Sequence, residues 1–246
     1  MSAPAIVVVG SSNTDMVVQA PRLPRPGETV LGGDLVIAAG GKGANQAVAA
    51  ARVGGRVTFV ARVGRDMFGE AALANFRREG LDTRFVVQDE QAPSGVALIV
   101  VGPGGQNIIA VAPGANHRLT VADVAAAASA FQQARVLLLQ LEIPLETVVA
   151  AAQAGRAAGA TVILNPAPIR TVKPETLSHV DFLIPNEIEA EKMSGISIHD
   201  GDSASKAARQ LRHMGAGVVV ITMGDKGALL SRAEGELLIP APSEIA

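Results

Sequence analysis

Short apolar runs alternate with alanine-rich segments along most of this chain. The runs are rich in Val, Ile and Leu, as expected of strands that are buried on both faces of a sheet. They cover residues 5–9, 56–63, 136–139, 161–164, 182–184 and 218–222. Helical character is found between several of them, at residues 43–53, 68–79, 121–131, 146–158 and 203–214. Because strand–helix alternation builds parallel sheets, we predict an α/β fold with helices on both faces.

Two regions interrupt this alternation and predict a second, smaller sheet. Strand-like segments without helices between them lie at residues 16–20, 29–37, 85–88, 95–101 and 107–111. The turn sequences Pro-Arg-Pro-Gly at 24–27 and Gly-Pro-Gly-Gly at 102–105 indicate hairpins. We expect residues of about 16–37 and 85–111 to form a lid over a ligand cleft within a single domain, 1–246. A last hairpin is predicted at 228–231 and 236–239.

Composition excludes several classes of function. The 246 residues include no cysteine, so disulfides and thiolate metal sites are excluded, and the chain suits a reducing compartment. A net charge of −2 and the absence of Trp and Tyr argue against nucleic acid and anionic membranes as partners. The apolar run at 5–9 is too short for a secretion signal, and no stretch approaches a membrane span. The sequence therefore predicts a soluble, cytoplasmic protein.

The segment Gly40-Gly-Lys-Gly-Ala-Asn-Gln46 concentrates polar groups at a predicted helix start. Its glycines allow a tight turn and a close approach to a ligand. The first helical turn is expected to offer free N–H groups beside Lys42 and Asn45. A P-loop is excluded because Gly43 stands where Ser or Thr is required, and a dinucleotide fingerprint is excluded because Gln46 replaces its third glycine. A tight turn without a ligand is the alternative.

Polar side chains also follow two of the predicted strands. Asn13 and Asp15 come after the first strand, and two residues apart on an extended segment they point the same way. Glu142 follows the strand at 136–139 in a similar position. Ligands of open α/β sheets bind at this carboxyl edge, where such groups can hold adjacent hydroxyls. The alternatives are an Asx turn at 13–15 and a solvent-facing acid at 142.

Two further segments have both a structural and a functional interpretation. Asn186 is a natural helix N-cap, although Glu189 in the same turn could help to hold a hydrated Mg²⁺ at nucleotide phosphates. Thr222-Met-Gly-Asp-Lys-Gly227 is either a β-turn or a backbone nest for a nucleotide. No His-x-x-x-His pair and no Gly-x-Ser-x-Gly occur, so neither a zinc site nor a hydrolase elbow is indicated.

Taken together, these motifs resemble the ribokinases of the PfkB carbohydrate kinase family, over residues of about 7–239. The resemblance rests on Gly10-Ser-Ser-Asn-Thr-Asp15, Pro26-Gly-Glu-Thr-Val30, the glycine segment to Ala47, Gln140-Leu-Glu142, Asn165-Pro-Ala-Pro168, Pro185-Asn-Glu187 and Ile221-Thr-Met-Gly224. It implies a Rossmann-like three-layer α/β/α sandwich with a small β-sheet lid. It also implies a homodimer that forms through the lid.

The resemblance implies a role for each candidate residue. The positions that match sugar-binding residues are Asn13, Asp15, Gly41, Lys42, Asn45 and Glu142. The positions that match the nucleotide side are Asn186, Thr222, Gly224 and Gly227, with Glu189 linked to Mg²⁺. The reaction implied is phosphorylation of D-ribose at O5 by ATP, which depends on alignment and charge stabilisation.

The sequence departs from the family in one respect. Family members carry a motif of the form Asp-Thr-x-Gly-Ala-Gly-Asp, whose glycine turn forms the anion hole and whose last Asp is the general base. No Gly-Ala-Gly-Asp occurs here, so no catalytic residue is assigned. We expect a truncated, inactive chain, with the base, the anion hole and a possible K⁺ site beyond Ala246, and with an uncovered apolar face on the strand at 236–239. The alternatives are a related sugar or nucleoside kinase and a catalytically inactive sugar-binding protein.

Overall fold

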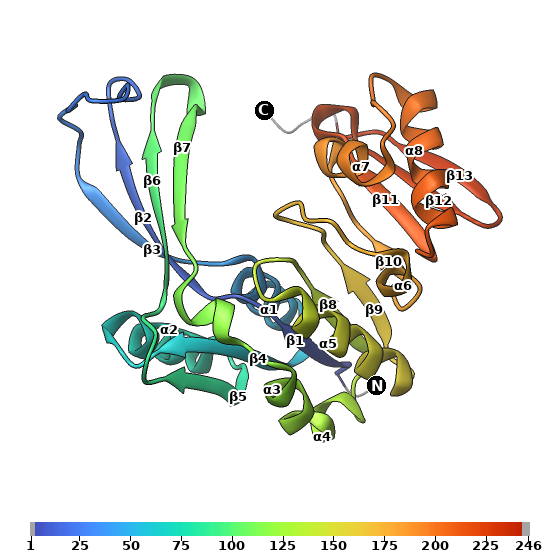
Figure 1. Cartoon of the computed structure of the whole chain (residues 1–246), viewed down its shortest axis with the longest axis horizontal. Helices are drawn as coiled ribbons and strands as arrows, with labels where there is room; N and C mark the ends of the chain where they lie inside the picture. Colours follow the sequence, from blue (N-terminus) through green and yellow to red (C-terminus); the bar gives the residue numbers. More distant parts are fainter. Residues whose placement is uncertain (1–2, 243–246) are drawn as a thin grey trace.

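The computed structural model describes residues 3–242, which form one large sheet, a smaller sheet and the helices around them (Figure 1). The large sheet has nine strands in the order β13-β12-β11-β10-β9-β8-β1-β4-β5. In this order, every neighbouring pair from β11 through β10, β9, β8, β1 and β4 to β5 is parallel. Its strands are β1 Ala5–Val9, β4 Arg56–Gly64, β5 Asp82–Asp89, β8 Val136–Leu139, β9 Thr161–Leu164, β10 Phe182–Leu183, β11 Val218–Thr222, β12 Ala228–Arg232 and β13 Gly235–Ile239. The parallel sheet expected from the apolar runs is therefore confirmed.

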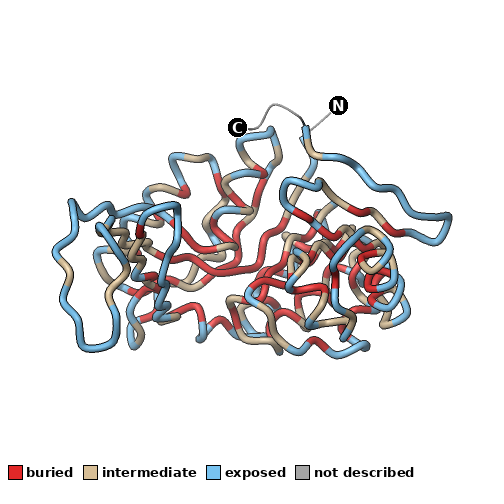
Figure 2. Tube along the Cα trace, turned by 90° about the horizontal axis from the view of Figure 1, so that it is seen from above, coloured by how far each residue is buried: buried red, intermediate tan, exposed pale blue. Residues whose placement is uncertain are grey.

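Helices cover both faces of this sheet. They are α1 Lys42–Arg52, α2 Met67–Arg78, α3 Val121–Ala126, α4 Ala128–Phe131, α5 Leu145–Ala157, α6 Pro174–Leu177, α7 Glu187–Ser194 and α8 Gly201–His213. Successive side chains of β1 point to opposite faces of the sheet and belong to different core clusters. Val8 belongs to the cluster with residues of α1 and α2, whereas Val7 and Val9 belong to the cluster with residues of α3 and α5. Figure 2 shows that the buried segments of the chain run through the middle of the molecule. No helix within residues 3–242 is long and apolar enough to cross a membrane.

The smaller sheet, called the lid here, has the strand order β3-β2-β6-β7. These strands are β2 Asn13–Gln19, β3 Leu35–Gly40, β6 Gly95–Val101 and β7 Asn107–Ala112, and they project from the body in Figure 1. β2 and β3 pair antiparallel, as do β6 and β7, so both predicted hairpins form. Many apolar lid side chains are exposed, namely those of Leu35, Val36, Ile37, Leu98, Ile108, Ile109 and Val111.

Three sequence predictions require correction. Residues 85–88 belong to β5 at the edge of the large sheet and not to the lid, because they pair in parallel with β4. The segment 29–34 is irregular, and β3 begins only at Leu35. The helix expected at 121–131 is two short helices, since the backbone leaves helical geometry at Ala127 (φ −87°, ψ 11°).

The β12–β13 hairpin extends the large sheet at the end far from β5. All five residues of β13 are exposed, including Leu237 and Leu238 at 58% and 52% of their surface. This confirms the uncovered apolar face that was expected at residues 236–239.

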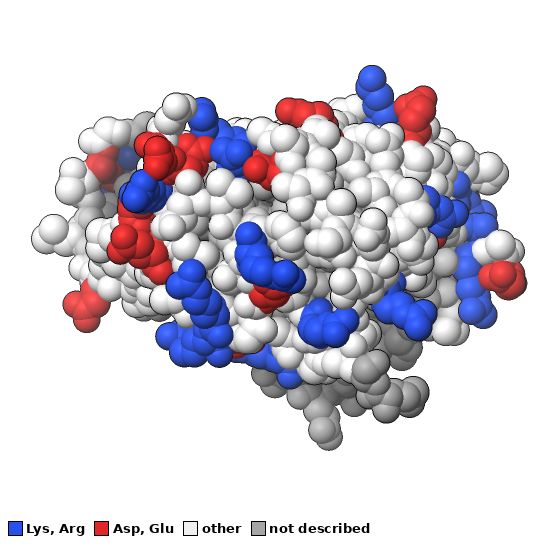
Figure 3. Space-filling model, turned by 90° about the horizontal axis from the view of Figure 1, so that it is seen from below, with Lys and Arg blue, Asp and Glu red and all other residues white. Residues whose placement is uncertain are grey.

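Charges of both signs are distributed over the face of the molecule shown in Figure 3.

Candidate functional site

Strand pairing in the lid brings the two polar segments of the sequence together. Asn13 opens β2 and pairs with Gly40, which closes β3 just before α1. The Asp15 carboxylate lies directly against Gly40, where an added Cβ would come within 2.3 Å of both of its oxygens. Only glycine therefore leaves room for this carboxylate beside the turn into α1.

Glu142 joins the same site by binding the start of α1. Its Oε2 accepts hydrogen bonds from the Lys42 amide (2.9 Å) and from Ser11 Oγ (2.5 Å). The Gly43 amide donates to Ser11 Oγ (3.1 Å), and the Ala44 amide donates to the Ser11 carbonyl (2.8 Å). Glu142 and Ser11 therefore cap a helix whose own N-cap, Gly41, has no side chain.

This capping corrects the expectation of free N–H groups at the helix start. The amides of Lys42, Gly43 and Ala44 all have partners within the protein. The polar groups of the segment that stay available are therefore the side chains of Lys42 and Asn45, which are neighbours one turn apart. The Lys42 ammonium lies 4.0 Å from Glu142 Oε1 and is partly exposed, and the Asn45 side chain faces solvent.

The structure thus places Asn13, Asp15, Gly41, Lys42 and Glu142 in one cluster at the carboxyl ends of β1 and β8, with Asn45 on the adjoining helix turn. Sequence reasoning did not identify Ser11 or the buried Asn116 as part of this cluster. Ser11 was present in a quoted motif, but Asn116 carries no sequence signal because it lies about a hundred residues from its partners.

Asp15 is electrostatically unusual. Burial raises the pKa of its carboxyl above the ordinary value of 3.8, the neighbouring Glu142 raises it further, and Lys42 opposes both effects. Because an ionised carboxylate accepts hydrogen bonds from hydroxyls better than the neutral acid does, we expect the affinity for the sugar that the resemblance implies to fall as pH is lowered. The loss should begin at a higher pH than an unperturbed aspartate would give. Titration calorimetry at successive pH values checks this, and Asp15→Asn should remove this part of the pH dependence.

Gly43 is required by a backbone contact. A Cβ at this position would lie 2.4 Å from the Ser11 amide nitrogen and 2.7 Å from Gly10 atoms, and backbone cannot move aside as a side chain can. We expect Gly43→Ala to lower the free energy of unfolding by roughly 1–3 kcal/mol, as overpacking does, and to weaken sugar binding. Gly201→Ala is the matched control, because no atom lies within 4 Å of the point that its new Cβ would occupy. Urea unfolding that shows equal effects for the two variants would contradict this account.

The candidate nucleotide residues gather at the same edge of the sheet, further along the strand order. Asn186 forms a bridge with Thr222, and the Thr222 amide donates to the Pro185 carbonyl (2.9 Å). Gly224 and Gly227 lie in the turn after β11, both with positive φ, and a Cβ at Gly227 would clash with the carbonyl of Ile239. β10 is three strands from β1, which corresponds to about 14 Å at the usual strand spacing.

Glu189 has a clear structural role. Its Oε2 accepts from the Asn186 amide (2.9 Å) while Asn186 Oδ1 accepts from the Glu189 amide (2.8 Å), which is a complete capping box. Among the residues that the structure describes, no cluster of three or more His, Asp or Glu side chains could hold a metal. One carboxylate oxygen of Glu189 is therefore engaged at the start of α7.

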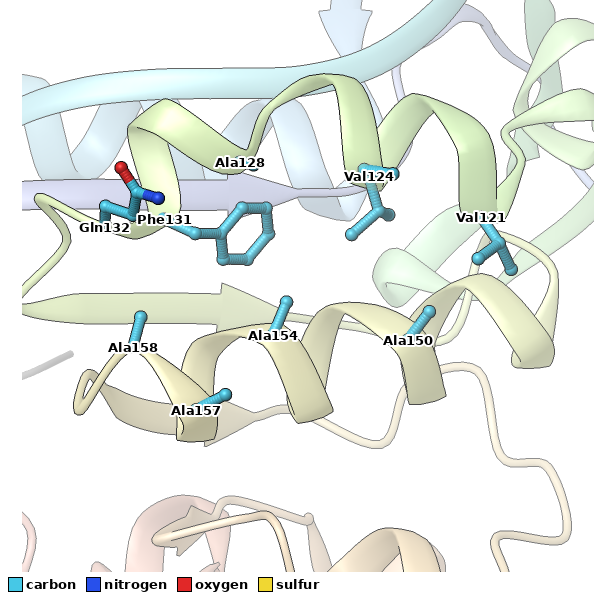
Figure 4. Close-up of a pocket in the computed structure, with 10 residues that line it drawn as sticks. Val121, Val124, Ala128, Phe131, Gln132, Ala150, Ala154, Ala157 and Ala158 are labelled. Atoms are coloured by element: carbon cyan, nitrogen blue, oxygen red, sulfur yellow. The ribbon is translucent and has the colours of Figure 1, made fainter.

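The pocket in Figure 4 belongs to a different part of the molecule. It has a volume of about 370 Å³ between α3, α4 and α5, and it is lined mostly by alanines together with Phe131 and two valines. None of the candidate residues contributes to it. It is a groove between outer helices without the convergent polar groups of a ligand site.

Comparison with known proteins agrees with this architecture. The family model for pfkB family carbohydrate kinases matches residues 3–245. A ribokinase of Haemophilus influenzae is 42% identical over 227 residues, which are 92% of this chain and 74% of the relative. A deoxyribokinase of Salmonella typhi is 37% identical over 96% of this chain and 78% of the relative. A structure of Arabidopsis thaliana ribokinase complexed with ribose and ATP is 30% identical and matches 98% of this chain and 78% of that chain with a TM-score of 0.86. The ribokinase-like fold is therefore confirmed.

Proposed function

Since this chain belongs to the pfkB family of carbohydrate kinases, we propose that it acts in the ATP-dependent phosphorylation of D-ribose at O5. The observation that carries the proposal is the convergence of Asp15, Lys42 and Glu142 at one end of the sheet. A carboxylate, an ammonium group and the amide of Asn13 together offer acceptors and donors to several adjacent hydroxyls. The relatives named ribokinase, and the one solved with ribose and ATP, support ribose and ATP as the ligands.

In this proposal, the residues of the chain bind and orient the two substrates. Asp15 accepts hydrogen bonds from sugar hydroxyls, and Asn13, Lys42 and Asn45 fix the orientation of the ring. Glu142 holds the start of α1, so that Gly41 and Lys42 keep their positions at the sugar. Asn186, Thr222, Gly224 and Gly227 bind the nucleotide, with Glu189 near a hydrated Mg²⁺. ATP supplies the transferred phosphoryl group, and the reaction is assigned to the cytoplasm.

No Gly-Ala-Gly-Asp occurs in the sequence, and we propose that none of the 246 residues acts as the general base. We therefore propose that these residues bind the sugar but transfer the phosphoryl group extremely slowly. A general base and an anion hole each contribute roughly 10²–10⁴-fold to a rate. We assign the K⁺ site to the same motif, which this sequence does not contain.

The experiment that tests this function measures binding and turnover separately. Calorimetry should give saturable, one-to-one binding of D-ribose to the 246-residue chain. A coupled assay for ADP should show negligible turnover of this chain with ribose and ATP. The Haemophilus influenzae relative, assayed in parallel as the positive control, should phosphorylate ribose. Absence of ribose binding contradicts the proposal, and rapid turnover by the 246 residues contradicts only the assignment of the base.

A second candidate substrate is 2-deoxy-D-ribose, which is favoured by the deoxyribokinase at 37% identity. The two sugars differ by one hydroxyl, and a site built to hydrogen-bond that hydroxyl discriminates strongly against its loss. Comparing the two Kd values decides between them. A nucleoside is less suited to the site, because the chain has no Tyr or Trp to stack on a base.

We also propose that the lid forms a homodimer interface, supported by its exposed apolar residues. Ile109→Arg places a charge on β7, where the side chain is 52% exposed, and should convert a dimer to a monomer. Ile188→Arg, at a 61% exposed position on α7, is the matched control and should leave the dimer intact. Light scattering after gel filtration checks both. A monomeric wild-type protein, or equal dissociation by the two variants, contradicts this interface.

A further inference from the structure

We infer that Asn116 is a positioning residue that fixes which end of the Asn13 amide faces the sugar. This inference rests on the proposed sugar site, and it assigns Asn13 Nδ2 as a hydrogen-bond donor to the sugar. Asn116 is 2% exposed and lies on the short 3₁₀ turn Gly114–Arg118, about a hundred residues from Asn13 in the sequence. No part of the sequence motif that predicts the site includes it.

The orientation of Asn116 follows from one backbone donor. The Ser12 amide donates to Asn116 Oδ1 at 2.8 Å, and because a backbone N–H can only donate, the atom that it faces must be the oxygen. The Asn116 Nδ2 group is therefore directed to two acceptors, the Ser12 carbonyl at 3.1 Å and Asn13 Oδ1 at 2.7 Å. Each amide in this chain of contacts has only one orientation that satisfies its neighbour.

This contact determines which end of the Asn13 side-chain amide stays available to a ligand. Its Oδ1 accepts from Asn116, so Nδ2 is the end left for a ligand, and among the described residues Nδ2 donates no hydrogen bond. The contact is tightly enclosed, because a Cβ at Gly95 would lie 2.2 Å from Asn13 Oδ1 and 2.3 Å from Asn116 Nδ2. Asn13 itself is 8% exposed, which leaves little freedom for the amide to turn.

The turn that carries Asn116 is itself held firmly. The Ala115 amide donates to the Pro93 carbonyl (2.8 Å), and Gly114 adopts a positive φ of 51° with no room for a side chain beside Pro93 and Ser94. Arg118 closes the other end with a hydrogen bond from Nε to Asp89 (2.8 Å). Asn116 therefore holds Asn13 Oδ1 in one position. The sugar group that faces Asn13 Nδ2 must accept a hydrogen bond.

The test compares two substitutions that separate positioning from structural support. Asn116→Asp keeps an acceptor for the Ser12 amide but presents oxygen to Asn13, so the Asn13 amide is expected to reverse. The Kd for D-ribose should rise by about tenfold or more. Asn116→Ala removes both contacts to Ser12 but leaves Asn13 able to keep its orientation, and a smaller loss is expected. A purely structural role predicts that the loss of affinity follows the loss of stability, so the melting temperatures of both variants are compared with their Kd values.

A double-mutant cycle with Asn13→Ala provides the decisive comparison. Without the Asn13 amide, Asn116→Asp should change the ribose Kd by less than about twofold. An equal change in both backgrounds, measured on proteins with comparable melting temperatures, overturns the inference. If Asn116→Asp does not fold, Asn13→Asp is used instead, since it presents only an acceptor to the sugar. Its expected loss is also about tenfold or more, and an unchanged Kd overturns the inference.

A measurement without ligand separates this inference from the proposed function. In protein with ¹⁵N-labelled asparagine, the side-chain protons of Asn116 should exchange slowly with water, because two acceptors hold them. Those of Asn13 should exchange quickly. The reverse pattern overturns the assignment of polarity even if ribose binds, whereas the expected pattern without ribose binding overturns only the proposed function.

Discussion

Asp15→Ala is expected to weaken D-ribose binding by at least about a hundredfold. In the proposed site the carboxylate accepts from two sugar hydroxyls, and hydrogen bonds to charged groups contribute about 1.5–3 kcal/mol each. Since about 1.4 kcal/mol corresponds to a factor of ten in Kd, two such bonds account for the expected loss. The position of Asp15 against Gly40, beside Lys42 and Glu142, is the structural reason for this expectation.

Titration calorimetry on matched variants makes this test specific. Asp15→Asn keeps the shape of the side chain and removes the charge, so an intermediate loss is expected. Asp34→Ala removes an exposed carboxylate outside the cluster and should leave the Kd unchanged. If Asp15→Ala changes the Kd by less than about tenfold, equivalent to 1.4 kcal/mol, the sugar site has been placed wrongly.

Asp89→Ala is expected to lower the free energy of unfolding by about 3–5 kcal/mol, the range for breaking a buried ion pair. The Asp89 carboxylate is almost fully buried and accepts from Arg62 Nη1 and Arg118 Nε, both at 2.8 Å. It also accepts from the amides of Gln91 and Ala92. Removing it leaves two guanidinium groups without this partner and removes one of the hydrogen bonds that hold the turn carrying Asn116.

The same network predicts how stability depends on pH. Burial alone would raise the pKa of Asp89, but the Gln91 amide and the guanidinium groups of Arg118 and Arg62 outweigh burial and hold the pKa well below its usual range. A carboxyl with a lowered pKa stabilises the fold fully above its unfolded pKa, near 3.9. This contribution is lost progressively as pH falls below about 4.

Urea unfolding followed by circular dichroism checks both statements. The wild type should lose stability between neutral and acidic pH more steeply than Asp89→Ala does, because the variant has already lost this carboxylate. Glu90→Ala is the control, since its ion pair with Arg65 is largely exposed and is expected to be worth less than about 1 kcal/mol. Equal losses for Asp89→Ala and Glu90→Ala would contradict the role given to the network.

The regular elements were the most predictable part of this protein. Apolar runs located β8, β9 and β11 with the observed bounds, because strands that are buried on both faces carry a strong local pattern. The same local pattern could not assign β5 to its sheet. β5 belongs to the large sheet because it pairs with β4, and the sequence of residues 85–88 alone does not indicate that pairing.

The site was predictable only in part for a similar reason. Asp15, Lys42 and Glu142 stand in recognisable motifs, and the structure brings them together. The capping of α1 by Glu142 spans 100 residues, and the contact of Asn116 with Asn13 spans 103. Such contacts are set by tertiary packing, so the free N–H groups expected from local sequence were already engaged.

A crystal structure of this chain with bound D-ribose tests the central claim most directly. We expect sugar density between the lid and the start of α1, with two hydroxyls on the Asp15 carboxylate and Asn13 Nδ2 directed at a sugar oxygen. Lys42 and Asn45 should contact the same molecule. Ribose bound elsewhere, or no ribose at this position at a concentration that saturates binding in solution, would contradict the account.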